Sequence, residues 1–142
     1  MIYITRKEHF NAAHKLFNEA WSEEKNDAVF GKCANKNWHG HNYDLFVTVK
    51  GNVNPDTGFV VNLKDLGSII RTDITDLLDH KNLNLDVKGM FAMPSTENVA
   101  IFIWNILFPK IKEMGADLHC IKLYETESNF VEYYGEYTIN DF

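Results

Sequence analysis

Cysteine is scarce in this chain of 142 residues, which carries only Cys33 and Cys120. Two cysteines cannot build the disulfide framework of a small secreted domain, so we expect free thiols in a reducing compartment. Long apolar runs are missing too, because no stretch reaches the roughly 18 apolar residues needed to span a bilayer. The first ten residues, MIYITRKEHF, place charges where a secretion signal needs an apolar segment. We therefore expect a cytoplasmic protein with no membrane partner.

Positive charge is also in short supply. Lysine and arginine number 14 against 20 acidic residues, which gives a formal net charge of -6. This balance argues against a nucleic-acid partner or an anionic membrane surface, although it is compatible with a local basic pocket for a phosphorylated small molecule. Hydrophobic residues make up 45% of the chain, an ordinary share for a globular protein. At this length the sequence predicts one domain over residues 1–142.

Apolar alternation predicts the strands. From His39 to Lys50 every second residue is apolar or histidine, the period of a half-buried strand, and residues 1–14 alternate more weakly. Residues 118–126 and 130–138 are typical of a hairpin joined by a short polar turn. A short returning strand is expected at 59–61.

Apolar residues at three- and four-residue spacing predict two amphipathic helices. The first begins near Asn62, and the second begins near Ser95 and ends at Gly115. Residues 18–38 lack a sustained period and are expected to form a long loop. The order of elements predicts an α+β protein with a four-stranded antiparallel sheet and two helices on one face. Pairing between subunits is one way to cover the exposed edges of such a sheet.

Two histidines separated by one glycine open the strand in the stretch GKCANKNWHGHNYDL. Residues two apart on a strand lie on the same side, so His39 and His41 present two imidazoles to one point. His14 supplies a third nitrogen if the first two strands are neighbours. Three neutral imidazoles with one open position form the ligand set of a catalytic Zn²⁺. The pattern alone also fits solvated or hydrogen-bonded histidines at a strand end.

Other candidate residues each have a functional and a structural interpretation. Cys33 lies in a cationic, polar loop that favours a thiolate base, whereas Cys120, between strand residues, is typical of a buried structural thiol. Asp79 beside His80 matches a carboxylate–imidazole relay or, alternatively, a helix C-cap. Glu125 faces inward by strand parity. A carboxylate there suits an amidine-like N–H pair, such as a pterin edge, or else an edge-strand salt bridge.

Five motifs in order span nearly the whole chain: FNAAHKL, FGKCANKNWHGHNY, LDHKNLNLD, STENVAIFIW and KLYET. Together they resemble the 6-pyruvoyltetrahydropterin synthase family, which includes the 6-carboxytetrahydropterin synthases. The resemblance implies the tunnelling fold (T-fold), in which subunits join four-stranded sheets into a trimeric barrel and two trimers stack as a hexamer. Such a homo-oligomer shares its active sites between subunits, so oligomerisation would be a condition of activity.

The resemblance also implies roles for individual residues. The zinc ligands of the family are matched by His14, His39 and His41, so Zn²⁺ is the implied cofactor. Cys33 matches the catalytic base. His80, with Asp79 beside it, matches a catalytic relay that reaches the cysteine from a neighbouring subunit.

On the substrate side, the resemblance assigns Glu125 to both the catalytic and the pterin-binding set. Thr96 and Glu97, in the STEN motif, match substrate-binding positions close to the same ring. Candidate cations for a triphosphate are Lys32, Lys36, Arg71 and Lys81.

The implied activity is that of a zinc-dependent lyase of tetrahydrobiopterin biosynthesis. It converts 7,8-dihydroneopterin triphosphate to 6-pyruvoyltetrahydropterin with loss of triphosphate, which is carbon–oxygen lyase chemistry. The alternative is the 6-carboxy-5,6,7,8-tetrahydropterin synthase of queuosine biosynthesis, a carbon–carbon lyase that releases acetaldehyde. Five residues separate Cys33 from His39, a gap that resembles the pyruvoyl type, because many queuosine enzymes have a shorter one.

Trp38 departs from the family pattern, since animal members commonly carry glycine just before the HGH motif. Two further classes stay open on the residues alone. A zinc hydrolase would use the three histidines and a water, leaving Cys33 and Glu125 without a role. A non-enzymatic pterin- or metal-binding module would not need Cys33.

Overall fold

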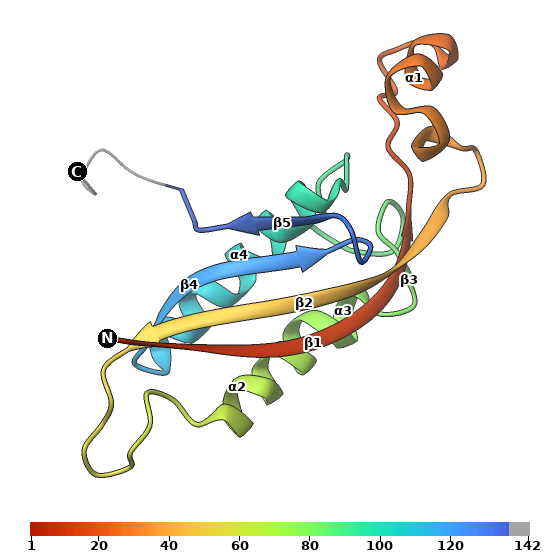
Figure 1. The fold of residues 1–142 in the computed structure, drawn as a ribbon. Coiled ribbons are helices and arrows are strands. Elements are labelled where there is room, and N and C mark those ends of the chain that lie inside the picture. Colours follow the sequence, from red (N-terminus) through yellow and green to blue (C-terminus); the bar gives the residue numbers. More distant parts are fainter. Residues whose placement is uncertain (137–142) are drawn as a thin grey trace.

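The centre of the computed structural model, which describes residues 1–136, is one twisted sheet (Figure 1). Two long antiparallel strands, β1 (Ile2–His14) and β2 (His39–Gly51), lie side by side. The antiparallel strands β4 (Asp117–Tyr124) and β5 (Phe130–Tyr133) extend the sheet beyond β2. The α+β class with an antiparallel sheet is therefore confirmed.

A fifth strand adds to the four that the sequence predicts. The order is β3-β1-β2-β4-β5, and β3 (Lys81–Asn82) runs parallel to the end of β1. Two residues are too short to show a period in the sequence, which is why β3 was not expected.

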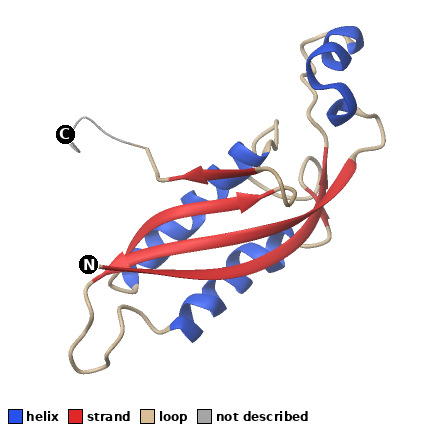
Figure 2. Ribbon diagram, viewed as in Figure 1, coloured by secondary structure: helices blue, strands red, loops and turns tan. Residues whose placement is uncertain are grey.

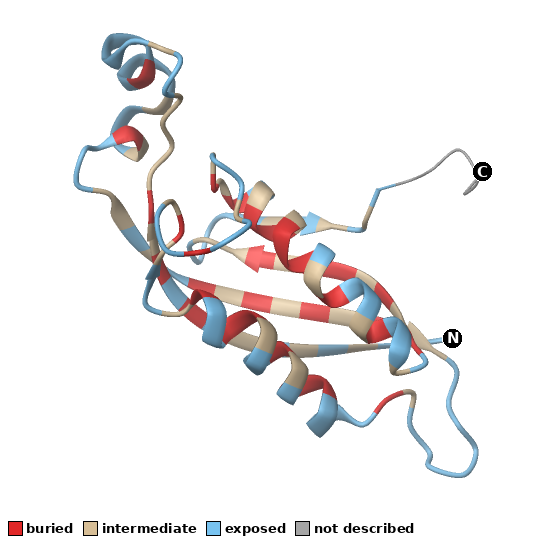
Figure 3. Ribbon diagram, turned by 180° about the vertical axis from the view of Figure 1, so that it is seen from behind, coloured by how far each residue is buried: buried red, intermediate tan, exposed pale blue. Residues whose placement is uncertain are grey.

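Helices cover one face of the sheet and leave the other uncovered (Figures 2 and 3). The first helical segment is continuous, with α2 (Leu63–Ile70), a π-helical turn η2 (Arg71–Thr75) and α3 (Asp76–Leu78). The second is α4 (Thr96–Glu113). Within residues 1–136, none of the helices combines the length and the apolar character that crossing a membrane requires.

The helix starts follow the side chains that cap them. Asn62 accepts a hydrogen bond from the backbone N–H of Lys64 at 2.9 Å, and Ser95 accepts one from that of Asn98 at 3.2 Å. These bonds satisfy backbone donors that the first turn of a helix leaves free.

The core lies between the sheet and these helices. Every second residue of β2 from Tyr43 to Val49 is fully buried, because that parity faces α2 and α4. The same parity continues to His41 and His39, so both histidines lie on the helix-covered face.

The expectation of a long loop at 18–38 is wrong. Residues 23–30 form α1 (Glu23–Phe30), followed by a 3-10 turn, η1 (Gly31–Ala34), and both stand off from the end of the sheet (Figure 1). Ser22 caps α1 by accepting from the N–H of Lys25, and two glutamates occupy its first turn. The only residue of α1 that is buried is Asn26. The helix has no apolar stripe, so a search for hydrophobic period misses it.

The expected strand at 59–61 is also wrong, because these residues form bends and pair with no strand. The N–H of Asn54 donates to the carbonyl of Phe59, and that of Gly58 to the carbonyl of Asn54, so the segment closes on itself as a turn. The hairpin of β4 and β5 is present, but β5 ends at Tyr133. The expected strand residues 137 and 138 lie outside the described residues.

Candidate metal centre and active site

The register of β1 and β2 brings three histidines together. His14 pairs with His39 across the two strands, and Ala12 pairs with His41. All three imidazoles lie on the helix-covered face, at the end of the ladder farthest from the N-terminus. The two strands are therefore neighbours, which is the condition under which His14 can serve as a third ligand beside His39 and His41.

The histidine rings converge with one carboxylate. One nitrogen from each ring and one oxygen of Glu125 lie within 4.8 Å of one another. The ring centroids are 4.6 Å apart for His14 and His39, 4.9 Å for His39 and His41, and 5.1 Å for His14 and His41. His14 is only 1% exposed, and the other two are half-buried. Imidazoles clustered in this way form a typical site for a divalent transition metal.

The unpaired nitrogens of the cluster fit a cation. His14 Nε2, His39 Nδ1 and His41 Nε2 are buried and have no hydrogen-bond partner. His14 Nδ1–H donates to the carbonyl oxygen of Pro94 at 2.7 Å. Because a carbonyl only accepts, this bond fixes the tautomer and leaves the Nε2 lone pair directed into the cluster. Buried polar atoms seldom lack a partner, and a cation between the rings supplies one for each.

The charge state of the rings also suits metal binding. The pKa of each of the three histidines is lowered, mainly because burial removes water from the charged form. Neighbouring imidazoles lower these pKa values further, whereas the carboxylate of Glu125 acts in the opposite direction. The rings are therefore neutral near pH 7, which is the form that ligates a metal.

Glu125 follows β4 and is held from two sides. Its Oε1 lies 3.0 Å from His41 Nε2, but that nitrogen still lacks an aligned hydrogen bond, so this is a close approach only. Its Oε2 accepts a hydrogen bond from the hydroxyl of Thr96, in the first turn of α4. The backbone N–H of Glu125 donates to the carbonyl of Asn129 at 3.0 Å.

A cavity of about 150 Å³ opens beside this carboxylate. Thr96, Glu97 and Glu125 line it from one side, and the start of β5 lines it from the other. The three residues that the sequence proposes for substrate binding therefore border one cavity, next to the histidine cluster.

Asp79 and His80 form a second polar group. His80 Nδ1 lies 2.9 Å from Asp79 Oδ2, while Asp79 Oδ1 accepts from the backbone N–H of Asn11 at 2.9 Å. The bond from Asn11 is the main cause of the lowered pKa of Asp79, and His80 contributes to it. The backbone N–H of His80 donates to the carbonyl of Asn11 at 2.7 Å, and the φ angle of His80 is 60°, in the left-handed region. Strand β1 thus positions both residues of the pair.

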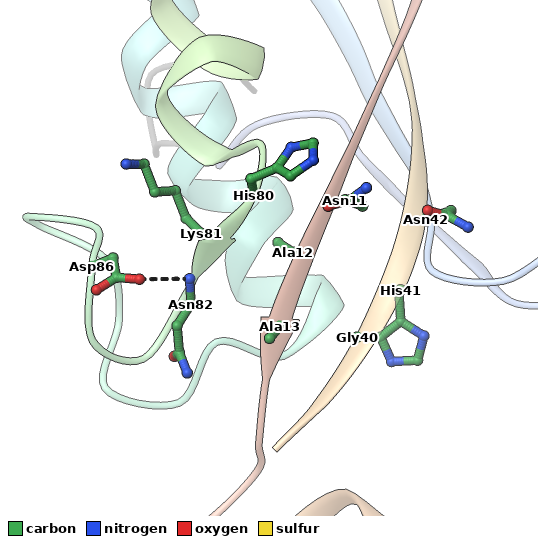
Figure 4. Close-up of a pocket in the computed structure, with 10 residues that line it drawn as sticks. All are labelled: Asn11, Ala12, Ala13, Gly40, His41, Asn42, His80, Lys81, Asn82 and Asp86. Carbon is green, nitrogen blue, oxygen red and sulfur yellow. Dashed lines mark hydrogen bonds between the residues drawn. The ribbon is translucent and has the colours of Figure 1, made fainter. Parts of the chain in front are cut away.

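This pair does not meet the histidine cluster within one chain. His80 is not among the groups that converge with the three histidines. It lines a cavity of about 560 Å³ with Asn11, Gly40 and Asn42 from the uncovered face of β1 and β2, and His41 also borders this cavity. In Figure 4 the ribbons of β1 and β2 pass between the rings of His80 and His41. The His80 side chain is 77% exposed, so it faces outward.

Cys33 lies in η1 and is half-buried. Its carbonyl oxygen accepts a hydrogen bond from the N–H of Leu16 at 2.8 Å, which ties η1 to the segment after β1. The thiol is not among the groups that converge with the three histidines. The described chain therefore keeps three parts of the proposed machinery separate: the cluster, the Asp79–His80 pair and Cys33.

Trp38 adopts a φ of 62°, the left-handed region that favours glycine. Its ring lies 4.6 Å from Lys15 Nζ, which packs against it from the residue after His14. A glycine, which the family resemblance leads one to expect here, adopts this left-handed backbone at a lower cost than tryptophan.

Sequence reasoning missed two residues of the site. Asn11 holds Asp79 through its backbone N–H, and no pattern in the sequence signals such a bond. Tyr43 is 0% exposed, and its buried hydroxyl has no hydrogen-bond partner. Its parity with His41 was available from the sequence, but an aromatic residue at that position is usually read as core.

Fold and site together define an α+β protein with a candidate three-histidine metal centre beside an acidic cavity. Residues 3–136 match the family model described as 6-pyruvoyl tetrahydropterin synthase. The chain belongs to the 6-pyruvoyl tetrahydropterin synthase family.

Relatives of known name cover nearly the full length of the chain. It is 47% identical to the 6-pyruvoyl tetrahydrobiopterin synthase of Pongo abelii, over 94% of this chain and 91% of that protein. Identity to the synthase of Dictyostelium discoideum is 44%, over 95% and 97% of the two chains. The solved structure of the Caenorhabditis elegans 6-pyruvoyl tetrahydropterin synthase superposes with a TM-score of 0.88 at 34% identity, covering 95% and 96%. The 6-carboxy-5,6,7,8-tetrahydropterin synthase of Rickettsia typhi is more distant, at 28% identity over 93% of this chain and 99% of that protein.

Proposed function

We propose that this chain is a zinc-dependent 6-pyruvoyltetrahydropterin synthase that converts 7,8-dihydroneopterin triphosphate to 6-pyruvoyltetrahydropterin with release of triphosphate. The observation that carries the proposal is the cluster of three neutral imidazoles with unpaired nitrogens beside Glu125 and its cavity. Similarity supports the pyruvoyl product, because the chain is 47% identical to a pyruvoyl synthase but only 28% and 29% identical to two carboxy synthases. A cytoplasmic location accords with this proposal.

The three histidines would hold the metal through His14 Nε2, His39 Nδ1 and His41 Nε2. A Zn²⁺ held there would supply Lewis acidity, which would make the hydroxyls of the substrate side chain more acidic. The Nδ1–H bond from His14 to Pro94 keeps that ring oriented and raises its basicity as a ligand.

Glu125 is suited to anchor the pterin ring. A carboxylate accepts the paired N–H groups of an amidine-like edge through both oxygens, and the Thr96 hydroxyl steadies one of them. Glu97 borders the same cavity. The anchor fixes the ring so that its side chain reaches the metal centre.

Cys33 would act as the base that moves protons between the substrate side chain and the ring. His80 would receive and return those protons, and Asp79, bonded to its Nδ1, holds the imidazole in one tautomer and stabilises its charged form. The hydroxyl-bearing carbon next to the ring would be oxidised to a ketone while the N5=C6 double bond of the dihydropterin ring is reduced, so that no external oxidant is needed. Loss of a proton from the second hydroxyl-bearing carbon would then expel triphosphate by elimination, and the enol that forms would tautomerise to the second ketone.

An oligomer with shared sites accounts for the separation of these groups. His80 points outward from the uncovered face, and η1 carries Cys33 away from the sheet, which supports the proposal that active sites are completed by residues of another copy. We therefore propose a homo-oligomer of the hexameric type that the family resemblance implies.

Product analysis tests the reaction. The zinc-loaded protein is incubated with 7,8-dihydroneopterin triphosphate, with the Cys33→Ala variant and a chelator-treated sample alongside, and products are identified by mass spectrometry. The proposal expects a 6-pyruvoyl product and free triphosphate only in the untreated parent. A 6-carboxy product with acetaldehyde would assign the chain to the queuosine branch instead. If the zinc-loaded protein left the substrate unchanged, the synthase assignment would be rejected in favour of a non-enzymatic pterin- or metal-binding module.

Subunit mixing tests the sharing of sites. Cys33→Ala and His80→Ala are each expected to be inactive, but co-refolding them in equal amounts should restore activity. If the two residues come from different subunits, about one site in four receives both intact residues in a random mixture. If the mixed oligomers showed no activity, Cys33 and His80 of each site would come from the same subunit.

A further inference from the structure

Tyr43 carries a buried hydroxyl that the ligand-free chain leaves unsatisfied. The side chain is 0% exposed, and its Oη has no hydrogen-bond partner. Phe10 stacks on the ring, with centroids 4.9 Å apart, so the ring has little freedom to carry the hydroxyl elsewhere. An unsatisfied buried hydroxyl is unfavourable, and phenylalanine would fill the same space without that cost. A functional role for the hydroxyl would explain why tyrosine, and not phenylalanine, occupies this position.

The strand register places Tyr43 opposite Glu125. Strand β2 pairs with β4 so that Asp44 lies opposite Tyr124, and continuing the register by one residue sets Tyr43 opposite Glu125 on the helix-covered face. Directly opposite residues of antiparallel strands have Cβ atoms about 5 Å apart. The negative charge of Glu125 also contributes, after burial, to raising the pKa of Tyr43 above its usual range.

Tyr43 also borders the histidine cluster. Its ring centroid is 5.7 Å from that of His41 and 6.2 Å from that of His14. In the described chain Glu125 Oε1 lies 3.0 Å from His41 Nε2, while Oε2 is bonded to Thr96. The nitrogen that Oε1 approaches is the one that a metal would occupy.

We propose that Tyr43 is a positioning residue: when a metal takes His41 Nε2, Oε1 of Glu125 turns away from His41 and accepts a hydrogen bond from the Tyr43 hydroxyl. Glu125 is then held by two hydroxyls, those of Tyr43 and Thr96. The proposal rests on the metal centre proposed above. Metal binding would thereby prepare the pterin anchor, and the donor that is unpaired in the metal-free chain would gain its acceptor.

If Glu125 Oε1 moves from His41 to Tyr43 on metal binding, the Tyr43 hydroxyl should raise the affinity of the site for the metal. The hydroxyl bond forms only in the metal-bound state, so removing it weakens metal binding without weakening the metal-free fold. A hydrogen bond to a charged acceptor contributes enough that Tyr43→Phe should lower the affinity for Zn²⁺ about tenfold. The metal-free variant should unfold at a urea concentration no lower than the parent, because it lacks the unsatisfied hydroxyl.

The experiment measures Zn²⁺ affinity by competition with a chromophoric chelator, on the full chain, for the parent and Tyr43→Phe. Tyr124→Phe is the matched control, because it removes a hydroxyl from the neighbouring strand position on the opposite face and should leave the affinity unchanged. In a Glu125→Gln background, Tyr43→Phe should have a much smaller effect, since the charged acceptor is gone. As a check that needs no variant, the hydroxyl proton of Tyr43 in the parent should move downfield in NMR spectra when Zn²⁺ is added.

Three results would overturn the proposal: equal Zn²⁺ affinity for Tyr43→Phe and the parent, an equal loss of stability in the metal-free and metal-bound protein, or an undiminished effect in the Glu125→Gln background. A parent that binds no Zn²⁺ would overturn it as well. The assay involves no pterin, so failure of the proposed synthase activity would leave this measurement decisive.

Discussion

Replacing His14 by alanine tests the metal centre most directly. His14 is the most buried member of the cluster, its Nε2 has no partner, and its Nδ1–H is bonded to Pro94. The substitution removes one ligand and leaves His39 and His41 on their strand. We expect a large loss of zinc affinity with a modest loss of stability in the metal-free protein.

The magnitude follows from the number of ligand groups. Structural zinc sites with four ligands bind with an apparent free energy of about 10–16 kcal/mol, so one ligand contributes roughly 3 kcal/mol, a factor of about a hundred in affinity. The lost bond to Pro94 contributes about 1 kcal/mol to the folded metal-free state. Metal affinity should therefore change far more than metal-free stability.

Chelator competition gives the affinity, and urea unfolding of the metal-free protein gives the stability. The matched control is His9→Ala, which removes an exposed imidazole from the opposite face of the same strand and should change neither quantity. If a folded His14→Ala protein bound zinc as tightly as the parent, the three-histidine centre would be refuted.

Three further outcomes follow from the same structure. The histidines of the cluster have pKa values lowered by burial, so the unfolded chain binds protons first, and the metal-free protein should lose stability as the pH falls below about 6.5, measured by urea unfolding at several pH values. Ser95→Ala removes the cap of α4 and should lower the free energy of unfolding by about 1 kcal/mol, whereas an unchanged value would deny the cap a role. Leu45→Ala, at a 0% exposed core position, should cost about 2–5 kcal/mol, and Leu85→Ala, 68% exposed, should cost almost nothing in the same assay.

Elements with a clear period were predictable from the sequence. Alternation identified β1 and β2, and three- and four-residue spacing identified the helices from Asn62 and from Ser95. Helix α1 escaped prediction because capping and charge stabilise it without an apolar stripe. The strand expected at 59–61 failed for the opposite reason, since its apolar residues are held in a turn by backbone bonds around Asn54.

The candidate site divides in the same way. The sequence by itself determined that His39 and His41 share a face, because residues two apart on a strand always do. Only the tertiary structure decided that His14 lies opposite His39, since register joins segments that are distant in the chain.

Tertiary structure also decided which side chains meet around the cluster and which stay apart from it. The helix start at Thr96 reaches the carboxylate of Glu125, while strand β1 holds Asp79 and turns His80 toward the other face of the sheet. Such contacts depend on how separate elements pack, and no local period encodes them. The missing hydrogen bond of the Tyr43 hydroxyl likewise depends on tertiary packing. A sequence indicates which residues are apolar enough to be buried, but not which of their polar atoms will lack a partner.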